Sequence, residues 1–331
     1  MGATRGLKAL FPPTTKKPKS QGQEPALLAT LDLHLLRSSM SLTSWLCVGA
    51  AVQAAISLFR IPFYLSLVLI LGVLGYRTGH ALLITFKLIP NPYLEDAIFN
   101  YTSAQIPNKE TGDFSDTPAA EPVGILHLGA KINHPLGAFS PHAQPLIKYA
   151  ETMYKVLDSD AKKSNGYLGG QSFDTVDKNG CMEFTFISYW RNIEAIHDFA
   201  YSSAHRKGWE WWNSVPKEEI KHLGINHEIF EAPAGQWETI YINHQPTLMG
   251  ATASYRPGDK SIGGTVENSW QSNIMDASRG PLRTSAGRLS RNREELAGRY
   301  SYVPKPLSKG WDGDGRDTLA AQGEKVISAV A

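Results

Sequence analysis

Residues 181–212, CMEFTFISYWRNIEAIHDFAYSSAHRKGWEWW, contain a strand pattern followed directly by a helix pattern. Apolar and polar residues alternate through its first ten positions, so that Met182 and Phe186 share one face of a predicted β-strand. Asn192 then provides a good N-cap, and the sequence predicts one helix from there to about Trp212. This strand and helix form the centre of the predicted domain.

The flanking segments complete the order of elements. They are a buried strand VGILHLGA at 123–130, a helix PHAQPLIKYAETMYKVL at 141–157, a strand YLGGQSFDT at 167–175, and two later strands at 226–231 and 237–243. A turn sequence at 177–180 predicts a hairpin with the strand that follows it. The order β-α-β-β-α-β is ferredoxin-like, so the predicted fold class is α+β. Such a sheet leaves one face open, and we expect a second copy to cover it in a homodimer.

Two uncharged apolar runs precede this domain. Residues 42–59 and 61–76 contain no charged residue, and each is close to the roughly 17–20 residues that a helix needs to cross a bilayer. Three arrangements stay open: a helical hairpin that turns at 60–62, one spanning helix with an interfacial helix, or a buried soluble hairpin. Basic residues flank both outer ends, which favours the hairpin with the soluble domain in the cytosol. We expect the membrane to be that of the endoplasmic reticulum.

The rest of the chain is polar. We expect a disordered basic tail at 1–40, membrane-anchoring helices at 41–90, a linker at 91–120, the ferredoxin-like domain at 121–250, and a largely disordered tail at 251–331. A net charge of +2 without basic stripes argues against nucleic-acid binding. Two cysteines build neither a disulfide framework nor a cysteine metal site. Without a GxGxxG between a strand and a helix, the sequence lacks a recognisable nicotinamide or flavin domain.

A row of histidine and aromatic side chains is the candidate site. His197, Tyr201 and His205 are spaced four apart and share one stripe of the predicted helix, which Trp209 and Trp212 continue. Histidine titrates near neutral pH, so His205 or His197 is a candidate acid–base group in a pocket wall. Any one of these histidines alone is more typical of a helix that is braced against a sheet, whereas the stripe as a whole favours a functional role. A metal site and an axial haem ligand are two further alternatives for these histidines.

A second group of candidates lies on the predicted final strands. Tyr241 and Asn243 share a strand face, and the Asn243 amide suits an oxyanion or a polarised carbonyl. Trp190 ends its strand just before the helix, where pocket openings often lie. We therefore expect a small-molecule pocket lined by Trp190, Tyr201, Trp209, Trp212 and His227.

The sequence HEIFEAPAGQWETIY, residues 227–241, with the strand ending at Trp190 and the helix carrying His197 and His205, resembles a fungal family of antibiotic-biosynthesis-monooxygenase-like proteins. The resemblance implies a dimeric α+β barrel and a role in fungal secondary metabolism. Related small monooxygenases oxidise electron-rich substrates with oxygen and without a cofactor. The resemblance therefore implies His205 as the base, the aromatic side chains as the pocket, and Asn243 or Tyr241 as the partner of the developing anion.

The leading hypothesis is a membrane-anchored monooxygenase that oxidises a lipophilic polyketide or terpenoid intermediate without a cofactor. Its expected partners are the substrate, oxygen, the membrane and a second copy of the chain. A haem-dependent enzyme of the same fold, such as a dehydratase, is the second hypothesis. A non-catalytic, membrane-associated binding protein is the third.

Overall fold

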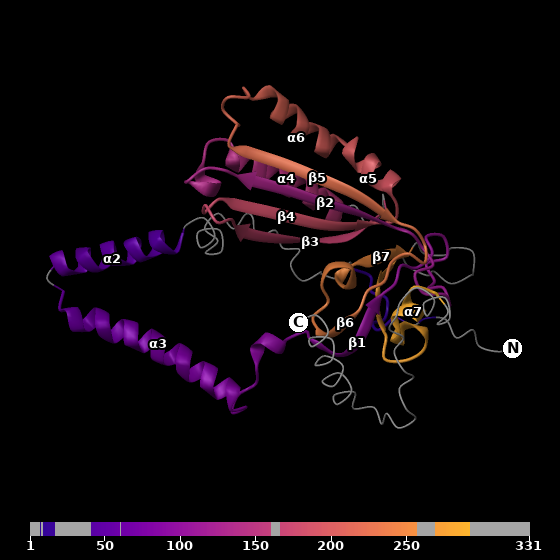
Figure 1. Ribbon diagram of the computed structural model, residues 1–331, viewed down its shortest axis with the longest axis horizontal. Helices are drawn as coiled ribbons and strands as arrows, with labels where there is room; N and C mark the ends of the chain where they lie inside the picture. The colour runs from indigo at the N-terminus through magenta and orange to yellow at the C-terminus, as the bar shows by residue number, and fades with distance from the viewer. Residues whose placement is uncertain are drawn as a thin grey trace, which may run out of the picture. The chain divides into compact units, whose positions relative to one another are not determined.

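Four antiparallel strands form the central sheet of the computed structural model, which describes residues 7, 9–16, 41–59, 61–159, 166–256 and 269–291 (Figure 1). They lie in the order β3-β4-β2-β5 and are β2 (Val123–Ile132), β3 (Tyr167–Val176), β4 (Met182–Trp190) and β5 (Leu223–Ala232). Each neighbouring pair is antiparallel. With helices between β2 and β3 and between β4 and β5, this is the ferredoxin-like order, and the predicted fold class is confirmed.

The β3–β4 hairpin turns at the expected residues. Asp177 accepts hydrogen bonds at Oδ1 from the backbone N–H groups of Asn179 and Cys181, at 2.8 and 3.0 Å. Gly180 has a φ of +82°, a conformation that glycine adopts without steric cost. Lys131 on β2 lies 2.7 Å from Asp177 Oδ2. That hydrogen bond, together with the backbone N–H groups, lowers the pKa of Asp177 to about 2.

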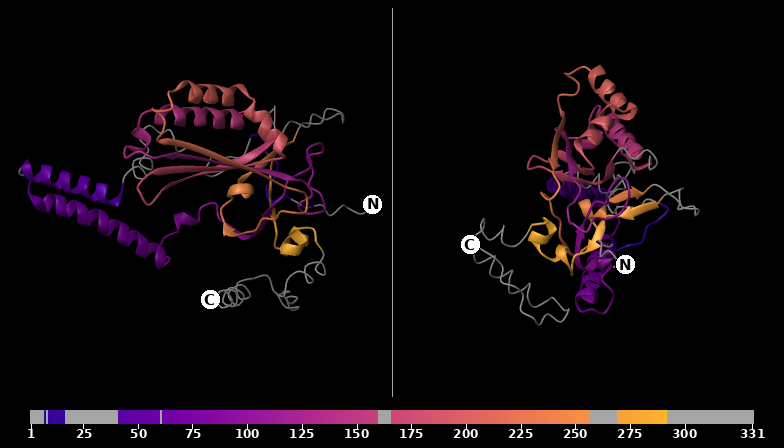
Figure 2. Two further views of the ribbon diagram at one scale, coloured as in Figure 1. Left: turned by 45° about the horizontal axis from the view of Figure 1, so that its top comes forward. Right: turned by 90° about the vertical axis from the view of Figure 1, so that its right-hand side faces the viewer.

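Three helices cover one face of the sheet (Figure 2, left). They are α4 (Ala143–Ser159), α5 (Ile193–Ala200) and α6 (Ser203–Ser214). Asn192 caps α5 by accepting a hydrogen bond from the Ala195 N–H, as predicted. The single helix predicted to about Trp212 is wrong, because the backbone of Ser202 is extended (φ −64°, ψ 157°) and its hydroxyl caps a new helix at the His205 N–H.

The opposite face of the sheet is covered at one end by a second layer. Its strands are β1 (Ile98–Ala104), β6 (Tyr241–His244), β7 (Ala253–Arg256), β8 (Ser269–Ser272) and β9 (Ile274–Asp276), joined by the short helices η4 (Leu248–Ala251), η5 (Pro281–Arg283) and α7 (Ser285–Arg288). β1 lies between β6 and β9, and β7 pairs with β8. Val123, Trp237 and Met249 are buried where this layer meets the sheet.

This layer differs from the expected linker at 91–120 and the expected disordered tail from 251. Buried polar side chains that bond to one another explain the difference. Asn273, which is fully buried, donates to Thr252 Oγ1 at 2.8 Å and accepts from Ser254 Oγ at 2.9 Å. Residues 9–14, expected to be a disordered tail, also pair with this layer. Residues 17–40, 257–268 and 292–331 lie outside the described part of the chain.

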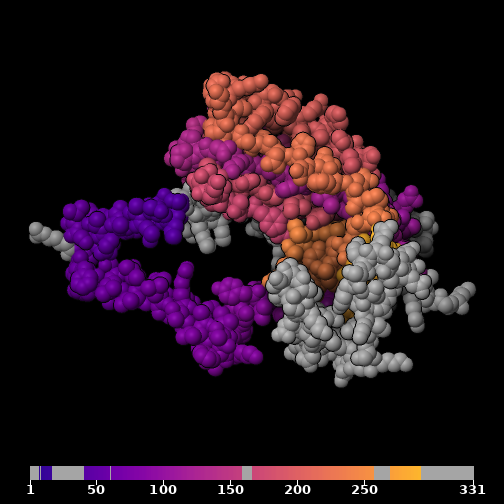
Figure 3. Space-filling view, viewed as in Figure 1, coloured from indigo at the N-terminus to yellow at the C-terminus, as the bar shows by residue number. Residues whose placement is uncertain are grey.

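The two apolar runs form helices α2 (Leu42–Leu58) and α3 (Phe63–Thr85), which the structure describes in full. None of their residues is buried, and Figure 3 shows their side chains at the surface along both helices. α3 has 23 residues and spans about 34 Å at 1.5 Å per residue, so it is long enough to cross a bilayer. α2 has 17 residues. Gln53 of α2 donates to Ser66 of α3 at 3.4 Å.

Candidate active site

A chain of aromatic rings leads from the sheet to His205 on the helix-covered face. The ring centroids of Tyr167 and Trp190 are 5.0 Å apart, those of Trp190 and Phe199 5.8 Å, and those of Phe199 and His205 6.1 Å. Trp190 is fully buried, and its indole N–H donates to Ser188 Oγ at 2.9 Å. These rings fix the inner side of His205 against an apolar wall.

His205 lies in the first turn of α6 and is half-buried, with its ring edge against Phe199. His197 is exposed on α5, and Tyr201 is 76% exposed at the end of that helix. The expected single stripe of His197, Tyr201 and His205 therefore does not form, because the chain changes direction at Ser202. Of the three, His205 is the side chain that combines contact with the aromatic core and access to solvent.

The tryptophans of α6 divide between the surface and the core. Trp209 is 57% exposed, whereas Trp212 packs against the buried cluster that contains Ile147 and Ile220. Trp211 stacks on Tyr149 of α4, with ring centroids 5.3 Å apart. Trp209 is therefore available to contact a ligand beside His205, and Trp212 serves the packing of α6.

Tyr241 and Asn243 lie on the other side of the sheet. The Tyr241 hydroxyl accepts from the Gly250 N–H at 2.9 Å, and the ring packs with Tyr189 in the cluster under the second layer. Burial raises the pKa of Tyr241 and of Tyr189. Asn243 is exposed, with a left-handed φ of +50°, which asparagine tolerates better than most residues.

The four-stranded sheet separates these candidates. Trp190 and Phe199 belong to the cluster under the helices, and Tyr189, the neighbour of Trp190 on β4, points to the second layer. The structure therefore does not bring Tyr241 or Asn243 close to His205. The prediction that these residues act together with His205 on one substrate is wrong. His227 is exposed on the edge strand β5, opposite Leu128.

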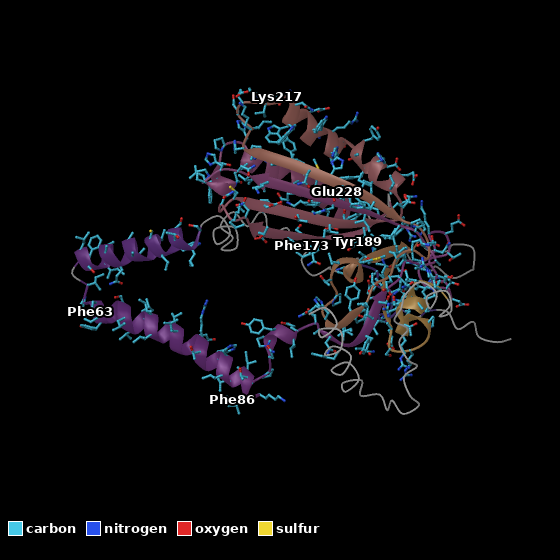
Figure 4. The ribbon with its side chains drawn as sticks, in the orientation of Figure 1. Phe63, Phe86, Phe173, Tyr189, Lys217 and Glu228 are labelled. Atoms are coloured by element: carbon cyan, nitrogen blue, oxygen red, sulfur yellow. The ribbon has the colours of Figure 1, made fainter. Side chains whose placement is uncertain are left out.

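His127, which the sequence did not single out, meets Glu228, a residue considered only as a possible metal ligand, on the open face of the sheet. His127 and Glu228 are direct neighbours across β2 and β5, with His127 Nδ1 3.8 Å from Glu228 Oε2. Phe173 of β3 is 41% exposed and Phe230 of β5 is 53% exposed, and both lie on this face of the sheet. Figure 4 labels Phe173 on β3 and Glu228 on β5. These side chains lie close together because of the strand register, which no sequence motif predicts.

A polar cleft of about 260 Å³ lies at the start of α5. It is lined by Lys109, Gly166, Arg191, Asn192, Glu194, Ala195 and Asp198. Arg191 donates to the Pro107 carbonyl at 2.8 Å, and burial lowers the pKa of its guanidinium. The charged lining does not suit an apolar substrate. Among the described residues, no group of three or more His, Cys, Asp or Glu side chains is arranged to hold a metal ion.

Comparison with known proteins finds a family match over the sheet and its helices. Residues 123–249 match the protein-family model described as Monooxygenase af470-like. Monooxygenase af470 of Aspergillus fumigatus is 27% identical over 288 residues, covering 87% of this chain and 99% of that protein. The matched range begins at the first residue of β2 and ends in η4, so it contains the whole ferredoxin-like unit and the aromatic chain that leads to His205.

Two solved structures are distantly similar to this chain. An aldoxime dehydratase in complex with butyraldoxime is 16% identical, with a TM-score of 0.31, over 59% of this chain and 45% of that chain. SnoaB, a cofactor-independent oxygenase from Streptomyces nogalater, is 11% identical, with a TM-score of 0.21, over 32% of this chain and 90% of that chain. At these values the fold class rests on the strand order and register of the sheet itself.

Proposed function

We propose that this chain, whose residues 123–249 match the Monooxygenase af470-like family model, is a membrane-anchored monooxygenase of fungal secondary metabolism. Its substrate is a lipophilic polyketide or terpenoid intermediate. The main support for the proposal is that the family match, residues 123–249, covers the whole ferredoxin-like unit. The relative named as a monooxygenase also aligns over nearly its whole length, including the region of the apolar helices.

His205 is the proposed base. Its half-buried ring has an apolar inner wall, and imidazole is the side chain that most often serves as a general base. An electron-rich substrate gives a proton to the imidazole and becomes a carbanion or enolate, which then donates an electron to dioxygen. In the overall reaction a CH₂ group becomes a carbonyl, one oxygen atom enters the product, and the other leaves as water with the two hydrogens. This balance needs no external reductant and no cofactor.

The backbone beside His205 replaces Tyr241 and Asn243 as the proposed partner of the developing anion. His205 lies in the first turn of α6, where the N–H groups of a helix carry partial positive charge. A negative charge that forms on the substrate there is favoured by this field. Tyr201 and Trp209, both exposed, are the proposed outer walls of the binding surface.

The membrane anchor suits a lipophilic substrate, which concentrates in the bilayer. We propose that α2 and α3 provide the anchor, that the membrane is the endoplasmic reticulum, and that the soluble domain faces the cytosol. The glycosylation sequon Asn100-Tyr101-Thr102 provides a check, because it is modified only on the luminal side of the membrane. A chain isolated from fungal microsomes is expected to keep its electrophoretic mobility after treatment with a peptide N-glycosidase. A mobility shift contradicts the cytosolic placement.

A homodimer is the proposed assembly. The second layer of the same chain covers only one end of the open sheet face. Phe173 stays exposed at the other end, and Phe230 stays exposed on the edge strand β5. Burial of these rings against a second copy removes apolar surface from water. Sedimentation of the detergent-purified chain is expected to give a dimer, and replacement of both rings by serine is expected to give a monomer.

The catalytic role is tested by a matched pair of histidine variants. In a strain that lacks the chromosomal copy, His205→Gln is expected to lower product formation on the order of 100-fold, the scale of a lost general base. His197→Gln, in which an exposed histidine eight residues earlier is changed, is expected to keep full activity. Equal activity of the two variants contradicts the proposed role of His205. A Soret band in the purified chain contradicts the cofactor-free mechanism and favours the haem-dependent alternative.

A further inference from the structure

Strand β9 pairs with two segments of the chain. One precedes the apolar helices in the sequence, and the other follows them. On one edge it pairs with β1, where Ser103 lies opposite Met275. On the other edge Ala9 forms a bridge to the same Met275, and the Leu10 N–H donates to the Ile274 carbonyl at 3.0 Å. A segment that precedes α2 and a strand that follows α3 are therefore fixed to one three-residue strand.

A second set of contacts fixes the N-terminal segment to β8. Thr14 and Trp270 exchange two backbone hydrogen bonds, of 2.9 and 2.7 Å. The Gln271 side chain donates to the Phe11 carbonyl at 3.0 Å. Leu7 packs against the buried cluster of the second layer. Residue 7 and residues 9–14 are thus part of the soluble domain through backbone pairing and side-chain packing.

This pairing restricts how the helices meet a membrane. The chain leaves the soluble domain after residue 14 and returns to it at residue 98, and α2 and α3 both lie between these points. Both points are in one folded layer, so they lie on the same side of any bilayer. The chain must then cross the bilayer an even number of times. One spanning helix with an interfacial helix, an arrangement that the sequence left open, would separate residues 9–14 from β9.

The helices themselves favour two crossings over none. An interfacial helix needs a polar face, whereas α3 exposes consecutive apolar side chains from Leu67 to Leu71, which point in all directions around the helix. α2 spans about 25 Å and α3 about 34 Å, against a hydrocarbon thickness of about 30 Å. The Gln53–Ser66 hydrogen bond pairs the polar groups of the two helices with each other.

We propose that α2 and α3 enter a lipid bilayer as one hairpin, inserted between two segments of the same sheet layer, with the turn after Phe59 at the far side. Residues 9–14 and the soluble domain then lie on the same side. This inference rests on the proposed membrane anchoring and is independent of the oxidation chemistry. A chain that catalyses nothing but keeps this topology leaves the inference intact and removes only the monooxygenase proposal.

The test is cysteine labelling in sealed microsomes. The two native cysteines are replaced by serine, and single cysteines are placed at Thr15, Phe59 and Lys178, all of which are exposed. With a membrane-impermeant maleimide, positions 15 and 178 are expected to react to the same extent in intact vesicles. Position 59 is expected to react only after the vesicles are opened by detergent.

Each other result overturns the proposal. Opposite accessibility of positions 15 and 178 means a single crossing. Reaction of position 59 in intact vesicles together with 15 and 178 means no crossing, as does release of the chain from the vesicles by alkaline carbonate. If a cysteine variant fails to accumulate, a glycosylation acceptor inserted at the same position reports the side of the membrane instead. It is expected to be modified at the 59 turn and to stay unmodified at 15 and 178.

Discussion

Replacement of Leu282 by alanine tests whether the C-terminal segment belongs to the folded core. Leu282 is 1% exposed and lies in the cluster with Met275 and Ala277, against which Leu7 packs. The change removes three carbon atoms, worth about 0.8 kcal/mol each in transfer free energy, and leaves a cavity at a site enclosed on all sides. We expect a loss of about 3 kcal/mol in the free energy of unfolding.

The assay is urea unfolding of the detergent-purified chain, followed by tryptophan fluorescence. Trp270 lies on β8 of the same layer and is 7% exposed, so its emission reports on this region. Leu136→Ala is the matched control, because Leu136 is 56% exposed and its loss is expected to change stability by less than about 0.5 kcal/mol. Leu282→Ala and Leu7→Ala are also expected to be non-additive, since both residues contact one cluster. Equal stability of Leu282→Ala and Leu136→Ala would refute the packing of this segment and favour the disordered tail that the sequence predicted.

Three further predictions concern separate parts of the molecule. Tyr241→Phe leaves the Gly250 N–H without its acceptor and is expected to cost about 1–3 kcal/mol of unfolding free energy, whereas Tyr201→Phe, at a side chain that is 76% exposed, is expected to cost nothing measurable. The pKa of Asp177 is lowered from 3.8 to about 2 in the folded chain, so its stabilising effect is present above about pH 4 and is lost as the pH falls toward 2; the stability gap between the wild type and Asp177→Asn is expected to close over that interval in acid titrations. Gly287→Ala is expected to unfold the C-terminal turn, because an added Cβ would lie 1.9 Å from the Pro281 carbonyl oxygen, and limited proteolysis is expected to cut this variant there first.

The sequence predicts the central sheet well, since its strands are long and mostly apolar on the helix-covered face. The DKNG turn fixes the β3–β4 hairpin, and Asn192 fixes the start of α5. The break at Ser202 was not predictable in the same way. The helical spacing of apolar residues continues through it, and serine within such a run identifies an N-cap only when the helix start is already known.

The sequence did not predict the second layer, for a different physical reason. The strands of this layer and the turns between them bury polar side chains such as Thr102, Ser103 and Asn273, so the apolar alternation of a half-buried strand is missing. Ser103 shares a hydrogen bond with Thr239, and Asn273 donates one to Thr252. The candidate site depended on contacts that only the register supplies. His127 meets Glu228 across two strands, and Tyr241 is separated from His205 by the sheet although both carry suitable chemistry.

The most direct test of the proposed oxygenation is growth under isotopically labelled dioxygen of a producing strain, a strain that lacks this chain, and the same deletion strain complemented with the wild-type chain. We predict one labelled oxygen atom at a single carbon of a lipophilic product in the producing and complemented strains. The deletion strain is expected to accumulate the corresponding substrate with two hydrogens at that carbon. An identical labelled product in all three strains would contradict the monooxygenase proposal and favour a non-catalytic binding protein.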